Sequence, residues 1–353
     1  MPDHATGPAT DRATDPAPRP SLLSRRQLLR GGLASAALLP LAAGLSGCQG
    51  QRPAELLSAS GELPALWMQR LPAGWRNRSL ADPAAVLRRL PEAALVALGD
   101  GWASSAGPWQ PLAAPALLAQ LDAWAQPVAR LWAAEASAPA LAFPWAFSPW
   151  VLALRSRPDL AARRAEGWQL LLDPSLRRRV VLPASPRVCI ELMGRDAGRI
   201  SALRRQALAH DDRDGLNLLL SGAAEAAVLP LRRLIPLLRR DQRLSVVLPD
   251  SGAPLSWQLL LRPAASAAPP PLDWLAMALQ PPLLESLLQA GWVPPLPRRR
   301  LDPLLQRMPP ALAALLLPPA PVLERCWSLP PLSPAQQLAL QTVWDVSEPR
   351  PGA

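Results

Sequence analysis

The sequence predicts an α/β fold with mostly parallel sheets. Short apolar runs of the kind that form buried strands alternate with segments of helical periodicity. This alternation is typical of strand–helix–strand units. About 306 residues remain after an N-terminal export signal, enough for one two-lobed protein or two domains with a sizeable core.

Residues 1–47 have the pattern of a bacterial export signal. Arg25 and Arg26 precede an apolar run of 15 residues, from Gly31 to Leu45, which is shorter than the roughly 20 residues that a membrane span needs. The stretch Ser-Arg-Arg-Gln-Leu-Leu resembles the signal for twin-arginine export, which carries folded proteins across the inner membrane. We therefore exclude residues 1–47 from the fold.

The signal ends in Leu-Ser-Gly-Cys, which resembles the lipobox of bacterial lipoproteins. Lipidation of Cys48 would anchor the protein to a membrane surface without spanning the membrane. The alternative is an ordinary buried cysteine at the end of a hydrophobic helix. With the anchor in place, residues 48–57 form a short tether, and the protein is periplasmic.

Local signals place the first elements. Asp82 and Pro83 open a predicted helix that carries Val86, with Asp82 as N-cap and Pro83 at the first position. The apolar run 94–98 predicts a buried strand that stops at the turn signal Gly-Asp-Gly, residues 99–101.

Further elements follow the same alternation. Residues 179–182 and 244–248 predict strands, each followed by a proline. Residues 272–280 and 283–290 predict helices, and Gly291 closes the second. The Pro-rich stretch 293–321 breaks any long element, so we expect short helices there.

The basic composition says little about partners. All 37 basic residues are arginine and tyrosine is absent, a bias that GC-rich codons explain. Without the signal, 32 arginines and 24 acidic residues give a formal charge of +8. A basic chain with 14 tryptophans could bind nucleic acid, but an exported lipoprotein rarely meets any, so we expect none. The clusters 177–179 and 298–300 are expected to be solvated or membrane-facing charge.

No motif for catalysis, a metal or a cofactor is present. His4 leaves with the signal, which leaves His210 and nearly excludes a zinc site. Residues 210–214 are better explained as a polar loop than as a cation site. The sequence has no nucleophile elbow, phosphate loop or dinucleotide-binding turn. Cys189 and Cys326 could be disulfide-bonded in an oxidising compartment or remain free thiols.

Four separated stretches resemble the solute-binding proteins of ATP-driven importers, of the spermidine/putrescine type. Residues 95–102 are similar to that family's strand and loop near the cleft, and residues 143–154 to its proline–aromatic segment. The most specific stretch is 167–187, with a tryptophan, Asp-Pro, basic residues and a strand leading into a ligand loop. The downstream stretches 220–222, 246–249, 257 and 281–294 follow in the family's order.

This resemblance implies a two-lobed periplasmic-binding-protein fold of type II, with a ligand cleft between lobes joined by crossing strands. Lobe 1 would comprise residues 56–150 and 259–345, and lobe 2 residues 151–258. The implied partners are a small solute, an ABC permease and an ATPase. The implied mechanism is capture by lobe closure.

The positions that bind polyamines in the family differ here. Ala184, Arg187 and Leu259 stand where the family places three acidic residues, and Leu229 or Pro230 stands where it places an aromatic one. The loss of three carboxylates favours a neutral or anionic solute over spermidine. Candidate cleft residues are Trp102, Trp145, Ser148, Trp150, Ser185, Arg187 and Trp257. Each tryptophan is equally compatible with core packing, and Arg187 with a surface role.

Two other functions remain open. The lost acidic residues are compatible with a binding-protein fold that has left transport for a sensor or scaffold role at the membrane. An envelope enzyme would need a clustered acid or nucleophile in the cleft, and the sequence shows none, so we expect no enzyme.

Overall fold

The computed structural model describes residues 52–135 and 137–349, which belong to one compact unit. The expected export signal, Arg25, Arg26 and Cys48 lie outside the described residues. Residues 54–57, expected at the end of the tether, form part of the first strand. No helix in the described part of the chain is long and apolar enough to cross a membrane.

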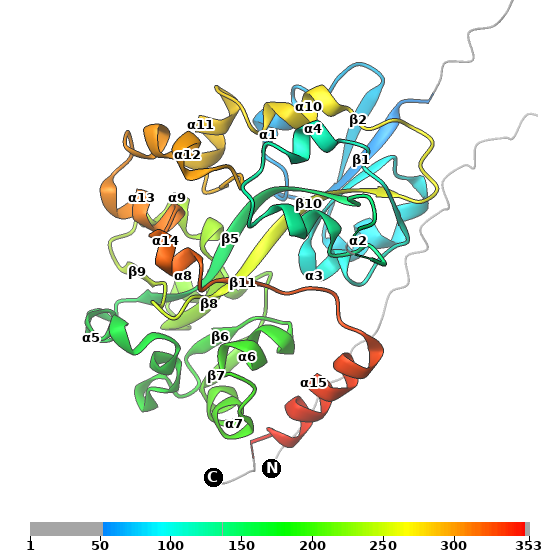
Figure 1. Cartoon of the computed structure of the whole chain (residues 1–353). Coiled ribbons are helices and arrows are strands. Elements are labelled where there is room, and N and C mark those ends of the chain that lie inside the picture. Colours follow the sequence, from blue (N-terminus) through cyan, green and yellow to red (C-terminus); the bar gives the residue numbers. More distant parts are fainter. Residues whose placement is uncertain (1–51, 136, 350–353) are drawn as a thin grey trace, which may run out of the picture. The chain divides into compact units, whose positions relative to one another are not determined.

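One mixed sheet organises the described residues (Figure 1). Its main path runs β2 (Trp75–Leu80), β1 (Ala54–Ala59), β3 (Leu95–Gly99), β10 (Pro254–Pro263), β5 (Ala142–Arg155), β8 (Ala226–Pro230), β6 (Val180–Leu182) and β7 (Ala207–His210). Outside this path, β4 (Trp109–Gln110) and β11 (Trp327–Ser328) pair with β10, and β9 (Leu244–Val247) pairs with β5.

The sheet combines two parallel groups with two long antiparallel strands. Strands β2, β1 and β3 form one parallel group, and β8, β6 and β7 form the other. Between them, β5 and β10 pair antiparallel with each other and with the adjoining strand of each group. The expectation of mostly parallel strands therefore holds at both ends of the sheet and fails in its centre, where the long strands cross from one group to the other.

Short helices cover this sheet (Figure 1). The first half of the chain contributes α1 (Ala65–Met68), α2 (Pro83–Arg88), η1 (Leu90–Glu92), α3 (Asp100–Ala103), α4 (Pro115–Leu118), η2 (Gln126–Arg130), α5 (Pro158–Ala162), η3 (Arg164–Leu172) and η4 (Pro174–Leu176). The second half contributes α6 (Pro186–Leu192), α7 (Ala197–Gln206), α8 (Gly215–Ser221), η5 (Leu231–Arg233), α9 (Ile235–Leu238), α10 (Leu272–Met277), α11 (Leu283–Gln289), α12 (Arg298–Leu305), α13 (Pro310–Leu316), α14 (Ala320–Leu323) and α15 (Pro334–Val346).

The local sequence signals are largely confirmed. The Asp82 side chain accepts the Ala85 N–H at 2.7 Å and caps α2, with Pro83 at its first position. Strand β3 ends at Gly99 as expected, but α3 begins at once at Asp100 instead of the predicted turn. Gly291 follows α11 with φ +90°, a conformation that glycine adopts without strain.

The remaining predicted elements are also present. The predicted strands at 179–182 and 244–248 form β6 and β9, and the predicted helices at 272–280 and 283–290 form α10 and α11. The Pro-rich stretch holds α12, α13 and α14, which are short as expected. In Figure 1, α10 lies at the top of the molecule near α1 and α4, and α11 to α14 follow down its left side.

Two hydrophobic clusters form the core. The larger packs around β1, β3, β10 and the first part of β5, and it also holds residues of β8 and α9. The smaller one packs around the last part of β5, β6, α6 and α7. Strands β5 and β10 are buried along nearly their whole length, since they have neighbours on both sides and helices on both faces.

The C-terminal segment runs from the centre of the sheet at β11 to helix α15 (Pro334–Val346) at the lower right of Figure 1. Strand β11 pairs in parallel with the start of β10, and α15 then packs on α6 and α7. The Arg204 guanidinium donates to the Trp344 carbonyl at 2.6 Å and lies 4.3 Å from the centre of its ring. Helix α15 therefore packs on the helices that cover the parallel group β8, β6 and β7.

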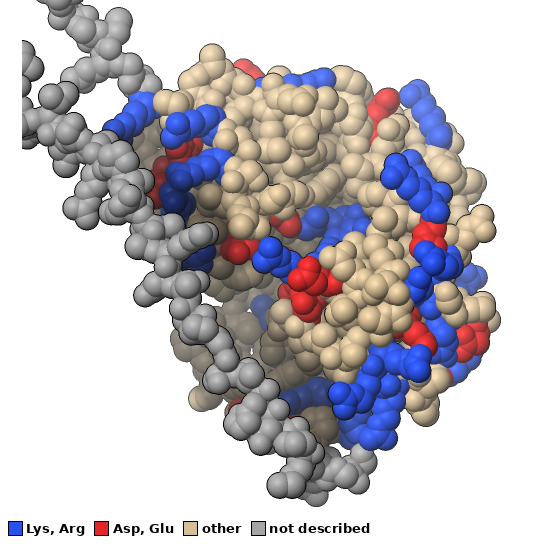
Figure 2. Space-filling model, turned by 180° about the vertical axis from the view of Figure 1, so that it is seen from behind, with Lys and Arg blue, Asp and Glu red and all other residues tan. Residues whose placement is uncertain are grey.

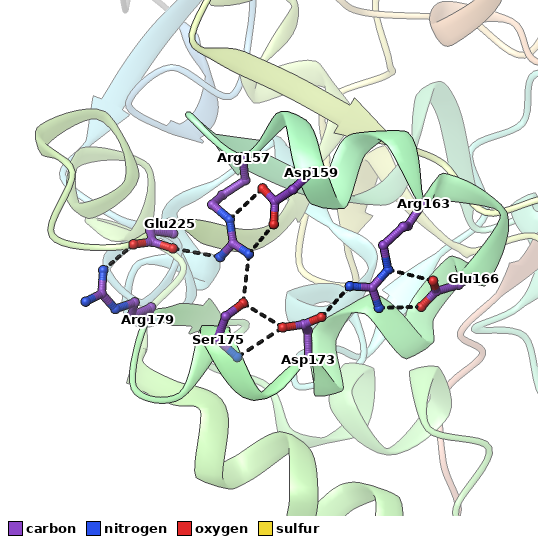
Figure 3. Close-up of polar contacts among 8 residues, drawn as sticks. All are labelled: Arg157, Asp159, Arg163, Glu166, Asp173, Ser175, Arg179 and Glu225. Atoms are coloured by element: carbon purple, nitrogen blue, oxygen red, sulfur yellow. Dashed lines mark hydrogen bonds and ion pairs between the residues drawn. The ribbon is translucent and has the colours of Figure 1, made fainter.

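An ion-pair network fastens the end of β5 to η4 and β6 (Figure 3). Arg157 lies between Asp159, at 2.6 Å, and Glu225, at 2.8 Å, and Glu225 also binds Arg179. Pairing with Arg157 lowers the pKa of Asp159 to about 2. The arginines 177–179 are exposed, as expected, whereas Arg300 of the second cluster donates to the Leu279 carbonyl at 2.7 Å.

Candidate functional site

The two parallel groups of strands end opposite each other. Gly99, the last residue of β3, is in register with Gln258, and Pro230, the last residue of β8, is in register with Trp150. On β5, the end of β3 is level with Ala146, which pairs with Gln258, and the end of β8 is level with Trp150. In open α/β sheets, ligands bind beyond the carboxyl ends of the strands, so the loops after β1, β3, β6 and β8 define the candidate site.

Asp100 lies at the floor of this site. Asp100 is buried, and its carboxylate accepts a hydrogen bond from the backbone N–H of Trp257 at 3.3 Å. Burial raises the pKa of Asp100 from its ordinary 3.8 to about 7, an effect that the hydrogen bonds and the charge of Arg187 partly offset. Close to neutral pH, Asp100 is therefore half protonated and offers either a donor or an acceptor.

Arg187 comes from the opposite group of strands, in the first turn of α6. Its Nε atom is buried and has no hydrogen-bond partner among the residues that the structure describes. Burial lowers the pKa of Arg187, and the charges of Glu191 and Asp100 act against that effect. Arg187 therefore places a guanidinium with unused hydrogen-bonding capacity near the junction, the region where the carboxyl ends of the two parallel groups face each other.

A cavity of about 170 Å³ opens beside Arg187. Helix α6 and the turn after it supply Arg187, Glu191 and Arg195, and Arg195 forms an ion pair with Glu191 at 2.8 Å. The C-terminal segment supplies the other wall, from Trp327 to Leu332 and Gln336. The cavity is smaller than the roughly 300–1,000 Å³ of pockets for drug-sized ligands, so it suits a small solute.

Four of the seven predicted cleft residues are at least partly accessible. Trp102 on α3 is 43% exposed, Ser185 before α6 is exposed, and Arg187 is partly buried. Trp150 on β5 is also partly buried, and it packs against the smaller hydrophobic cluster. The accessible residues come from both groups of strands.

The other three predicted residues are buried at the junction. Trp145 is 1% exposed and packs against Trp67 and Trp292, with ring centroids 5.1 and 4.8 Å away. Trp257 is fully buried, and its Nε1 atom donates to the Ser328 hydroxyl at 2.9 Å. The Ser148 hydroxyl accepts the backbone N–H of Arg232 at 2.9 Å. These side chains build the floor beneath the loops.

Sequence reasoning missed an ion pair between loops of opposite groups. Glu62 follows β1 and Arg232 follows β8, and one guanidinium nitrogen lies 2.9 and 3.0 Å from the two carboxylate oxygens. The Arg232 guanidinium also lies 4.4 Å from the centre of the Trp292 ring. Because 170 residues separate Glu62 from Arg232, no local pattern could have identified the pair.

The loop 210–214 packs against the loop after β6. The Asp212 carboxylate accepts the Ala184 N–H at 3.1 Å, and burial raises its pKa. Arg233 donates to the carbonyls of Asp212 and Arg213. No group of three His, Cys, Asp or Glu side chains suited to a metal ion occurs among the described residues. Figure 2, which shows the molecule from behind, shows acidic and basic side chains next to one another beside a hollow.

Comparison with known proteins identifies the fold. No family model matches the sequence, and no curated protein matches it. Among solved structures, a putative spermidine/putrescine ABC transporter from Listeria monocytogenes is similar over 84% of this chain and 98% of its own, with a TM-score of 0.60 and 12% identity.

Two further structures agree with this result. The spermidine/putrescine substrate-binding protein PotD of Streptococcus pneumoniae is similar over 83% of this chain and 98% of its own, with a TM-score of 0.63 and 8% identity. A periplasmic thiamin-binding protein is similar over 84% of this chain and 96% of its own, with a TM-score of 0.59 and 14% identity. The chain therefore has the α/β fold of the periplasmic binding proteins, as its sequence predicts.

Proposed function

We propose that this chain is the solute-binding component of an ABC importer. It captures a small solute between two lobes, residues 56–150 with 259–345 and residues 151–258, and delivers it to a permease driven by an ATPase. Export through the signal around Arg25 and Arg26 and lipidation of Cys48 hold it at the periplasmic face of a membrane. The fold and the opposed strand ends support this role.

The solute is neutral or anionic. One observation carries this choice: Arg187, in the first turn of α6, has unused hydrogen-bonding capacity and faces a small cavity. Trp102, Ser185 and Arg187 contact the solute, while Trp145, Ser148, Trp150 and Trp257 support the site from below. A polyamine at this position would meet a guanidinium of its own sign, which is unfavourable in a partly buried site.

Thermal unfolding in the presence of candidate solutes tests the proposal. Polyamines, amino acids, sugars and small carboxylates are added to the purified chain. A solute at 100 times its Kd stabilises the folded state by about 2.7 kcal/mol. We expect a shift with a neutral or anionic solute that Arg187→Gln abolishes and that Arg199→Gln, an exposed arginine of α7 that does not line the cavity, preserves. A shift with spermidine that survives Arg187→Gln would contradict the choice of solute.

A second function is favoured by the ion pair between Glu62 and Arg232, which joins the two groups of strands without a ligand. Such a chain could serve as a sensor or scaffold with its lobes held together. Small-angle scattering separates the two functions. An importer component becomes more compact when it binds its solute, whereas a scaffold keeps one radius of gyration with every solute of the panel.

A further inference from the structure

The environment of Arg232 resembles a recognition site for a cation. Its guanidinium has a carboxylate on one side, Glu62 at 2.9 and 3.0 Å, and an aromatic ring on the other, Trp292 at 4.4 Å. Carboxylates bind guanidinium and ammonium groups by charge-assisted hydrogen bonds, and aromatic faces attract the same cations. The guanidinium here belongs to the protein itself.

We propose that Glu62 and Trp292 form a cation-binding cage and that Arg232 occupies it as an internal ligand. The cage lies between loops that follow strands of opposite groups, where the fold exposes its ligand site. An internal guanidinium has no translational freedom to lose, so it outcompetes a free cation of similar affinity. The intact chain therefore rejects ammonium and guanidinium solutes at this position.

Several contacts hold Arg232 in this position. Its backbone N–H donates to the buried Ser148 hydroxyl at 2.9 Å. The Arg232 side chain is 15% exposed, and that of Glu62 is 23% exposed. Gly291, just before Trp292, lies so close that a β-carbon there would be 3.0 Å from the Arg232 carbonyl oxygen. The loop after β8 and the end of α11 thus meet closely beside the cage.

The neighbouring arginine provides a matched control. Arg233 adjoins Arg232 in η5, but its guanidinium donates to backbone carbonyls of Asp212 and Arg213 and, among the residues that the structure describes, to no carboxylate. Removal of the Arg233 side chain therefore removes one positive charge from the same helical turn and leaves the cage filled. Arg232→Lys is a second control, because it keeps a cation inside the cage.

The test is to empty the cage and supply a free cation. The purified chain carrying Arg232→Ala is titrated with n-propylguanidinium and with putrescine, and binding is followed by calorimetry and thermal unfolding. We expect binding of n-propylguanidinium at least about tenfold tighter than to the unsubstituted chain, since a charge-assisted hydrogen bond and a cation–aromatic contact become available. Arg233→Ala and Arg232→Lys should show no such gain.

Further substitutions make the outcome decisive. Adding Glu62→Gln to Arg232→Ala should abolish the gain, because the cage then has no charge. Arg232→Met, which keeps an apolar stem over Trp292, replaces Arg232→Ala if the latter does not fold. A folded Arg232→Ala or Arg232→Met chain that binds n-propylguanidinium no better than the unsubstituted chain would overturn the proposal.

The cage proposal and the proposed transport function can fail separately. The selection of solutes rests on the proposed function, whereas occupation of the cage by Arg232 does not. If the unsubstituted chain binds no solute of the panel but Arg232→Ala binds n-propylguanidinium, the cage stands and the transport function loses support. If the unsubstituted chain binds n-propylguanidinium as tightly as Arg232→Ala does, and Glu62→Gln weakens both interactions equally, Arg232 does not exclude cations from the cage.

Discussion

The side chains of Trp67 and Trp274 donate hydrogen bonds to each other's backbone. Each indole Nε1–H donates to the carbonyl oxygen of the other residue at 2.9 Å, and the two rings stack with centroids 4.4 Å apart. This reciprocal pair joins α1 to α10, although 207 residues separate the two tryptophans. Both rings are almost completely buried, and the two hydrogen bonds satisfy the indole nitrogens of both side chains.

We expect Trp67→Phe to destabilise the protein by about 2–3 kcal/mol. The substitution leaves the buried Trp274 carbonyl without its donor and reduces the packed area. Urea denaturation provides the free energy of unfolding. Trp102→Phe is the control, because Trp102 is 43% exposed and its replacement should change stability by at most about 0.5 kcal/mol. Equal losses in the two variants would refute a special role for the pair.

Asp100 should make stability fall as the pH rises from about 4 to 7. Below its ordinary pKa of 3.8 both states are protonated, while between 3.8 and about 7 only the folded state keeps the proton. The unfolded state gains relative stability across this window, by an amount of the order of 4 kcal/mol at neutral pH.

Asp100→Asn removes this titration and keeps an oxygen that can accept the Trp257 N–H. The difference in unfolding free energy between Asp100→Asn and the unsubstituted chain should therefore grow in favour of the variant as the pH rises from 4 to 7, and then remain constant. Denaturation series at several pH values measure that difference. A difference that is independent of pH would show that Asp100 titrates normally.

Alanine substitutions at two glycines with similar φ angles should destabilise the protein by different amounts. Gly252 has φ +86° and Gly74 has φ +83°. A β-carbon at Gly252 would overlap the carbonyl of Arg325, whereas a β-carbon at Gly74 would have no other atom within 4 Å. Gly74→Ala should cost about 1–2 kcal/mol from backbone strain alone. Gly252→Ala should cost clearly more, since the C-terminal segment must move. Equal melting temperatures for the two variants would contradict this expectation.

The two cysteines of the described chain should react slowly with thiol reagents. Both are free, which answers the question that the sequence left open. Burial raises the pKa of the Cys189 thiol to about 12, and burial also raises the pKa of the Cys326 thiol above its ordinary value. At pH 8 we expect iodoacetamide to modify Cys326 slowly and Cys189 more slowly still, and both at the rate of a free thiol in urea. Peptide mass spectrometry follows each site, and rapid native labelling of Cys189 would count against its burial.

The sequence predicts those parts of the fold that depend on neighbouring residues. The cap of α2 needs Asp82 and Pro83 side by side, and the end of α11 needs a glycine at 291. Such signals depend on only a few adjacent residues, so they can be read from the sequence without knowledge of the tertiary structure. The sequence also predicts the end of β3 but not the immediate start of α3, because Gly-Asp-Gly is equally suited to a turn.

The candidate site depends on contacts that the sequence does not display. Trp145 and Trp257 lie on strands buried on both faces, where the alternation that separates core from cleft residues is absent. Glu62 and Arg232 meet because two loops from distant parts of the chain lie opposite each other. Arg187 and Trp102 could be proposed from the family resemblance, while the cage could only be found in three dimensions.

The position of β10 between β3 and β5 has a consequence for synthesis on the ribosome. The strands that flank it are complete at Arg155, yet β10 begins only at Pro254. At about 5–20 residues per second, roughly a hundred further residues take about 5–20 s. During that interval the facing edges of β3 and β5 have no partner from β10. The nascent chain therefore passes through a stage in which the unpaired edges of β3 and β5 are open to premature pairing.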